Sequence, residues 1–241
     1  MNNSLSTRTS GILLIVESLI LFVPMAILGS AVNWPANLSE PASVNLPMMI
    51  EHATAIKVGY FIYLIYSILF FPVILMIAQT ISGNSTYSPL LKVAISFAGA
   101  STVARTFGIT RWLSAMPVLA NLYVNGTSET KATTSIIYDA VNSFGGTIGE
   151  ALGVGLFAGL SVFLICIALL QDSRFPRWVG ISGLVTALAI TLQSLELFGI
   201  DLGALISVLV GILHLWMLGV GIHFLSKPAA YDSAYHLTTQ A

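Results

Sequence analysis

Long apolar stretches constrain this chain more than any other feature of its sequence. A helix needs about 20 mostly apolar residues to cross the hydrocarbon core of a bilayer, and six stretches reach that length. Hydrophobic residues make up 56% of the 241 residues and charged residues only 8%. A soluble domain carries roughly a quarter of its residues as charged side chains, so this composition excludes a soluble enzyme. We predict an all-α polytopic membrane protein, a bundle of six transmembrane helices.

The six predicted helices fill most of the chain and leave room for one domain, residues 1–241. We expect the helices at about residues 11–31, 53–78, 90–119, 134–170, 177–198 and 203–225. The longest connection runs from Val32 to Glu51 and contains three prolines. We expect its end, Leu46 to His52, to form a short interfacial turn or a re-entrant cap.

Basic residues are distributed unevenly between the loops, and this bias predicts the orientation of a membrane protein. With the N-terminus inside, the inner segments contain Arg8, Lys92, Arg174, Arg177 and Lys227. The outer segments contain only Lys131, with Lys57 just inside the second helix. We therefore expect both termini in the cytoplasm.

Several functional classes find no support in the sequence. The net charge of −1 provides no basic surface for a nucleic acid. The single cysteine, Cys166, lies in an apolar run, which excludes a disulfide framework and a cysteine-based zinc cluster. His214 and His223 are nine residues apart, on opposite faces of one helix, and cannot ligate one haem iron together. We expect no metal ion and no cofactor.

Charged residues inside the predicted spans are the strongest candidates for a site, because a charge at mid-bilayer costs roughly 2.5–3.5 kcal/mol on insertion scales. Arg105 falls near the middle of the third helix, and Arg111 lies about 9 Å further out along it. Glu150 falls in the outer half of the fourth helix, so we expect an ion pair between Arg111 and Glu150. Glu17, in the first helix, is expected to be a buried carboxyl that forms a hydrogen bond, or to extend toward the inner surface.

Other polar residues are predicted on the same outer side. We expect a polar chamber closed by Glu196, Glu51 and His52, with His214 as a further candidate member. Asp139 is expected nearer the surface. Three interpretations remain open: these charges fix helix packing, they line a ligand or catalytic cavity, or they form an ion or proton pathway.

The fourth predicted helix also carries regularly spaced glycines. Gly145, Gly149 and Gly153 are four residues apart and therefore lie on one helix face. Small residues at this spacing let another helix approach closely. The face is expected to pack against a neighbouring span of the same chain, and the alternative is a homodimer through these three glycines.

Part of the chain resembles a known family. The segment YDAVNSFGGTIGEALGVGLFAGL, the loop FPRWVG at residues 175–180 and the opening STRTSGILLIVESLI carry the resemblance. The loop is similar to an I-P-R-W-L-G pattern, with Phe175 for isoleucine and Val179 for leucine. The chain resembles a bacterial family of multi-pass membrane proteins known only as a domain of unknown function, DUF4386-like. The resemblance implies about six helices and the inner membrane of a bacterial cell, and it implies no reaction.

Two functional hypotheses follow from the sequence. In the first, the protein is a non-catalytic membrane factor that binds a lipid or a protein partner. In the second, it is a membrane-embedded enzyme acting on an apolar lipid or isoprenoid substrate. Its catalytic residues would then be Glu150, Glu196 and His52, acting as acids or bases, while Arg105, Arg111, His214 and Asp139 would bind the substrate. An enzyme needs an apolar pocket of about 300 Å³ or more, whereas a purely structural ion pair needs none.

Overall fold

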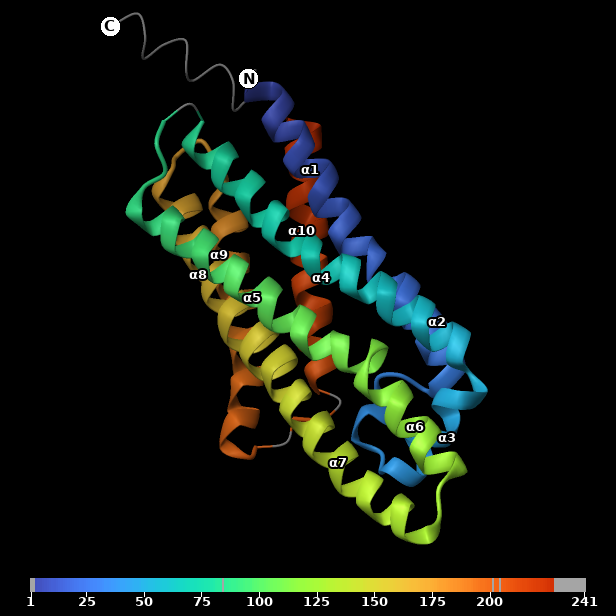
Figure 1. Ribbon diagram of the computed structural model, residues 1–241. Coiled ribbons are helices and arrows are strands. Elements are labelled where there is room, and N and C mark those ends of the chain that lie inside the picture. The colour runs from blue at the N-terminus through green and yellow to red at the C-terminus, as the bar shows by residue number, and fades with distance from the viewer. Residues whose placement is uncertain (1–2, 84, 201, 204, 228–241) are drawn as a thin grey trace, which may run out of the picture.

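The computed structural model describes residues 3–83, 85–200, 202–203 and 205–227. Within these residues the chain forms helices and no strand (Figure 1). The elements are α1 (Asn3–Ile20), α2 (Phe22–Val32), η1 (Ala36–Ser39), α3 (Ala42–Glu51), α4 (Ala53–Ser82), α5 (Pro89–Leu113), α6 (Ala115–Asn125), α7 (Ser128–Gly146), η2 (Thr147–Ala158), α8 (Gly159–Gln171), α9 (Arg177–Thr191), η3 (Leu192–Phe198) and α10 (Leu205–Ser226).

Five helical segments in the described residues are long and apolar enough to cross a membrane. They are Thr7–Val32, Ala53–Ser82, Ser128–Gln171, Arg177–Phe198 and Leu205–Ser226. These segments confirm an all-α, multi-pass membrane bundle. α5, which carries Lys92, Arg105 and Arg111 and several serines, threonines and glycines, is not among them. α5 nevertheless packs between α4 and η2, so a sixth span remains the prediction.

The long helices form a closed ring. α1 packs against α4, α4 against α5, and α5 against η2 and α8. α8 packs against α9, α9 against α10, and α10 returns to α1. Successive members run in opposite directions, so the beginning of α1 and the end of α10 lie at the same end of the molecule (Figure 1).

The boundaries of the expected spans differ from the structure in informative ways. The first span divides at Leu21 into α1 and α2, and the third divides at Ser114 into α5 and α6. The expected turn at the end of the first outer loop is a full helix, α3. The fourth span begins at Ser128 and extends over 44 residues. At 1.5 Å per residue this is about 66 Å, roughly twice the hydrocarbon thickness, so one end of α7 projects beyond the bilayer.

Two apolar cores hold the ring together at different heights. One lies toward the beginning of α1 and contains Leu14, Phe70, Ile165 and Phe224. The other lies toward α3 and α6 and contains residues such as Trp112. Burying apolar and aromatic side chains in this way fixes the packing of neighbouring helices. The space between the two cores is where the ring is least filled.

The loop between α2 and α3 is anchored to α7 by buried hydrogen bonds. Asn45 Nδ2 donates to the carbonyl oxygens of Asn37 (2.7 Å) and Glu40 (3.1 Å) and to Tyr138 Oη (2.6 Å). Asn142 Nδ2 donates to the Leu38 carbonyl oxygen at 2.8 Å. These bonds hold residues 33–41, hereafter the roof loop, over the end of the ring that faces α3 and α6.

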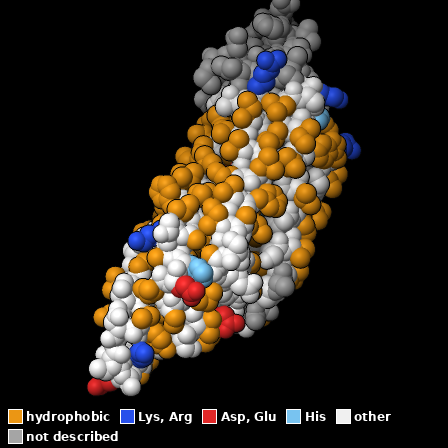
Figure 2. Space-filling view, turned by 90° about the vertical axis from the view of Figure 1, so that its right-hand side faces the viewer, with side chains coloured by type: hydrophobic (Ala, Val, Ile, Leu, Met, Phe, Trp, Pro, Cys, Tyr) orange, Lys and Arg blue, Asp and Glu red, His pale blue; other side chains and the backbone are white. Residues whose placement is uncertain are grey.

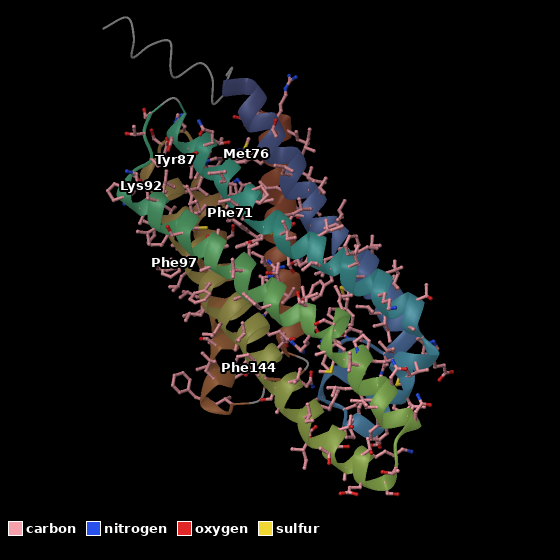
Figure 3. The ribbon with its side chains drawn as sticks, in the orientation of Figure 1. Phe71, Met76, Tyr87, Lys92, Phe97 and Phe144 are labelled. Atoms are coloured by element: carbon pink, nitrogen blue, oxygen red, sulfur yellow. The ribbon has the colours of Figure 1, made fainter. Side chains whose placement is uncertain are left out.

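Charged side chains concentrate toward the ends of the molecule. On the face seen in Figure 2, hydrophobic side chains cover the middle and charged ones lie toward both ends. The end where α1 begins carries Arg8, Lys92, Arg174, Arg177 and Lys227. Figure 3 shows Lys92 near Tyr87 at this end and Phe144 toward the opposite one. This pattern is typical of a bundle whose middle contacts lipid.

Candidate functional site

A cavity of about 450 Å³ lies inside the ring, between the two apolar cores. Its wall comes from α1, α2, the roof loop, α4, α5, η2, η3 and α10. Most of the lining is apolar, as in Met25, Val154 and Leu213, while Arg105, Glu150 and His214 supply the ionisable groups. The volume falls within the range of about 300–1,000 Å³ that small-molecule sites occupy. The cavity is therefore large enough for a ligand.

One side of this cavity borders the lipid-facing surface. α10 packs against α1 and α9, whereas α2 packs against α4. The cavity wall between α2 and α10 includes Leu19, Phe22 and Leu215, which are 50%, 58% and 71% exposed. Large apolar side chains with such exposure contact lipid chains in a membrane protein. Leu19 of α1, Phe22 of α2 and Leu215 of α10 thus belong both to the cavity wall and to the apolar outer surface.

Arg105 is the cation of the cavity wall. Its side chain is 4% exposed, and its guanidinium carbon lies 4.6 Å from the ring centre of Tyr66 and 5.5 Å from that of Phe70. Such distances allow cation–π attraction. Arg105 Nε has no hydrogen-bond partner. In the described part of the chain no carboxylate lies within ion-pair distance of Arg105.

Tyr66 and His214 form a fixed polar pair beside Arg105. His214 Nδ1 lies 2.7 Å from the Val210 carbonyl oxygen, and a carbonyl can only accept. Nδ1 therefore carries the proton in the neutral ring, and Nε2 accepts from Tyr66 Oη at 3.0 Å. His214, expected as a member of the polar chamber, lines this cavity. Tyr66 was missed by the sequence analysis, because a tyrosine in an apolar span has no distinguishing pattern.

Arg111 and Glu150 come together as the sequence predicted. Arg111 Nη2 lies 3.8 Å from Glu150 Oε1, and Arg111 Nη1 donates to the Gly108 carbonyl oxygen at 2.8 Å. The 3.8 Å between Arg111 Nη2 and Glu150 Oε1 is short enough for an ion pair and too long for a hydrogen bond. A small pocket of about 20 Å³ lies between these groups and Tyr60, enough for one water molecule. Glu150 also lines the larger cavity.

The remaining predicted residues do not gather at this cavity. His52 Nε2 lies 3.9 Å from Glu51 Oε1 at the junction of α3 and α4, and the Glu51 side chain is 73% exposed. Asp139 is exposed on α7, and Glu196 is half-buried in η3. None of these four belongs to the lining of the 450 Å³ cavity. The outer chamber expected from Glu196, Glu51 and His52 is therefore not assembled: Glu51 and His52 lie at the junction of α3 and α4, and Glu196 is not among the lining residues although η3 packs against η2.

The glycine face of the fourth helix packs inside the chain. A Cβ on Gly149 would lie 3.0 Å from Gly108 Cα, and one on Gly145 would meet the Arg111 side chain. A Cβ on Gly153 would lie 2.9 Å from Arg105 Cγ. These glycines thus allow η2 and α5 to approach each other closely. The expected packing against a neighbouring span of the same chain is therefore what these glycines form.

Glu17 is a second buried ionisable group near the cavity. It is 1% exposed, and neither carboxylate oxygen has a hydrogen-bond partner. The expected burial of this carboxyl is therefore confirmed, whereas the expected hydrogen bond and the extension to the surface are not seen. Glu17 is not in the cavity lining, although its neighbour Ser18 is.

The comparison with known families decides how the chain is classified. The family model described as "Domain of unknown function (DUF4386)" matches residues 9–227. The chain belongs to the DUF4386 family. No curated protein and no solved structure matches it. The resemblance based on the FPRWVG loop and the glycine-rich segment is thus confirmed at the family level, and the family's description assigns no reaction.

The structure adds two features to this DUF4386 chain that its sequence did not reveal. Residues 147–158 are π-helical, and this segment carries Glu150. π-Helical turns are rare and often occur at functional sites. Gln193 also lines the cavity, is 1% exposed, and has an Nε2 without a hydrogen-bond partner. Among the described residues no group of three histidine, cysteine or acidic side chains is placed to hold a metal ion.

Proposed function

We propose that the protein is a non-catalytic membrane factor that binds an amphipathic lipid in the 450 Å³ cavity. The observation that carries this proposal is the cavity itself, with apolar walls and a few polar groups at one place. This combination is typical of small-molecule sites, where apolar walls provide affinity and a few polar groups fix orientation. A tightly packed structural cluster would leave no such space.

The opening between α2 and α10 supports a ligand drawn from the bilayer. Leu19, Phe22 and Leu215 are exposed and also line the cavity. A hydrocarbon chain can pass between such side chains without crossing water, so entry involves little change in its surroundings. The roof loop supplies Trp34 and Leu38 to the wall, which separates the cavity from the aqueous side.

The experiment compares bound lipid in two phenylalanine variants. Gly211 lines the cavity, and a Cβ there would meet no atom within 4 Å, so Gly211→Phe should fill the space without disturbing the fold. Gly219→Phe is the matched control on the same helix, outside the lining, where Trp178 lies 4.0 Å from the added Cβ. Native mass spectrometry with lipidomics measures the lipid retained by each purified protein.

The expected result is a retained lipid in the wild type and in Gly219→Phe that is lost from Gly211→Phe. Equal thermal melting of the two variants would show that the loss is not due to unfolding. Lipid retained equally by all three proteins, or by none of them, would contradict the proposal.

An enzyme acting on a lipid is the second candidate, and the position of Glu150 favours it. Glu150 lines the cavity and is half-buried, so it could exchange a proton with a bound substrate. Glu150→Gln keeps the size of the side chain and removes its acid–base function. If the retained lipid is a substrate, wild type and variant will hold chemically different species. If the protein only binds, the same lipid will be found in both.

We also propose that the end of the molecule rich in lysine and arginine, with both chain termini, faces the cytoplasm in the inner membrane of a bacterial cell. Five basic residues at the end where α1 begins support this orientation, since cytoplasmic loops carry the excess of Lys and Arg. Under this orientation the roof loop and α3 lie on the outer side.

A further inference from the structure

We infer that the lipid bound in the cavity has an anionic oxygen head, a carboxylate or a phosphate monoester, and that Arg105 binds it. This inference rests on the proposed lipid-binding function and specifies the ligand class. The ligand class follows from the anionic group that would neutralise the buried guanidinium of Arg105. The following observations concern the charge, the geometry and the competition around Arg105.

Arg105 is buried and no described carboxylate pairs with it, although Tyr66 contacts it and Glu17 acts on it at longer range. It is 4% exposed, it lines both the large cavity and the 20 Å³ pocket, and no described carboxylate lies within ion-pair distance. Buried charges in proteins are normally paired, because an uncompensated charge is costly in a low dielectric. An anion in the adjoining space would supply the missing partner.

The surroundings of Arg105 hold it in place for such a contact. Its guanidinium lies over the rings of Tyr66 and Phe70. Gly153 makes room for its stem, since a Cβ there would lie 2.9 Å from Arg105 Cγ. The Tyr66 hydroxyl proton is engaged by His214. A planar guanidinium fixed in this way offers the parallel donors that match a carboxylate or phosphate.

The other charged residues near the cavity are less suited to binding an anionic head. Arg111 already has Glu150 at 3.8 Å and donates to the Gly108 carbonyl. Glu17 acts on Arg105 electrostatically but lies outside the cavity lining. Arg105 is therefore the cation that a ligand in the cavity would meet. The chain of the ligand would extend from Arg105 along apolar residues toward Phe22 and Leu215.

The test measures binding of three ligands that share one chain: hexadecanoic acid, hexadecyl phosphate and hexadecanol. The full chain is placed in nanodiscs of zwitterionic phosphatidylcholine, and native mass spectrometry measures each ligand bound. Inorganic phosphate is added in a separate series, which distinguishes a lipid head from a soluble anion. The variants are Arg105→Gln and Arg105→Lys, with Lys57→Gln as a control that removes an exposed cation outside the cavity.

We expect the wild type to bind the acid or the phosphate ester at least about tenfold more tightly than the alcohol, because hydrogen bonds to charged groups are the stronger ones. Arg105→Gln should remove this preference and leave alcohol binding unchanged. Arg105→Lys should keep part of it, and Lys57→Gln should keep all of it. The comparison of ligands in the wild type needs no variant, so it holds even if Arg105→Gln fails to fold.

The outcomes separate this inference from the proposed function. Equal binding of all three ligands by the wild type would overturn the anionic head and leave lipid binding intact. A preference that persists in Arg105→Gln, or displacement of the bound acid by inorganic phosphate at equal concentration, would overturn the assignment to a lipid head at Arg105. If no ligand binds at all, both the inference and the proposed function are wrong.

Discussion

At the scale of single residues, the contact between α5 and η2 depends on the absence of side chains at two facing positions. A Cβ on Gly108 would lie 2.7 Å from Gly149 Cα and 2.8 Å from the Gly145 carbonyl oxygen. Both atoms belong to the backbone, so neither can move without shifting a whole helix. The sequence predicted that the glycine face packs on another span, but only the structure identifies α5 as its partner.

Gly108→Ala should therefore destabilise the protein by about 1–3 kcal/mol, the usual cost of overpacking. Gly99→Ala on the same helix is the control, because its Cβ would lie 3.8 Å from the Phe71 ring, an ordinary contact distance. Thermal melting of the purified proteins in detergent measures both. Equal melting temperatures for the two variants would contradict the close contact.

The pair of Arg111 and Glu150 gives a second prediction at this scale. Their charged atoms are 3.8 Å apart, and Arg111 is mostly buried. Removing one partner leaves the other charge uncompensated, so Arg111→Gln and Glu150→Gln should each lower stability. In a double-mutant cycle the coupling should be about 0.5–3 kcal/mol, the range for residues in contact. Strictly additive losses would show that the pair does not interact.

At the scale of elements, the roof loop depends on α7 for its position. Asn45 is 1% exposed and donates hydrogen bonds to two carbonyl groups of the loop and to Tyr138. Because its lost bonds would leave buried acceptors unsatisfied, the loop should loosen when this amide is removed. Since Trp34 and Leu38 of the loop line the cavity, such loosening would also open the cavity toward the end of the bundle that the loop covers.

Asn45→Ala should accelerate amide hydrogen exchange across residues 33–41 and leave exchange in α9 unchanged. The control is Asn121→Ala, since Asn121 is exposed and donates only to the Pro117 carbonyl oxygen of its own helix. Hydrogen exchange read by mass spectrometry distinguishes the two. Unchanged exchange in the loop after Asn45→Ala would contradict the anchoring role of this residue.

Local sequence patterns predicted the elements better than the breaks within them. Apolar length alone located the spans that include α4 and α10, because hydrocarbon thickness sets helix length. The break at Ser114 and the π-helix at residues 147–158 have no such signal, since they arise from packing against other helices. Arg105, Glu150 and His214 were found because a charge or an imidazole in an apolar span is conspicuous. His52 and Glu196 were expected there too, but whether they reach the cavity depends on tertiary packing: His52 lies at the junction of α3 and α4, and η3 places Gln193 rather than Glu196 in the lining.

At the scale of the whole molecule, the distribution of basic residues predicts the orientation. Cys166 is the only cysteine and is buried, so Cys166→Ala provides a background free of thiols. In that background, Lys92→Cys and Glu129→Cys place single thiols at opposite ends of the molecule. A membrane-impermeant thiol reagent added to whole cells should label the cysteine at 129 and not the one at 92. The reverse labelling would contradict cytoplasmic termini.

The central claim is that a lipid chain enters the ring between α2 and α10. The most direct measurement is photo-crosslinking with a fatty acid that carries a diazirine in its chain, followed by mass spectrometry of the peptides. We expect adducts on the cavity-lining residues within segments 18–25 and 206–218, and fewer of them in Gly211→Phe. Adducts confined to outward-facing residues such as Phe107 and Val185, which are 67% and 62% exposed, would contradict the claim.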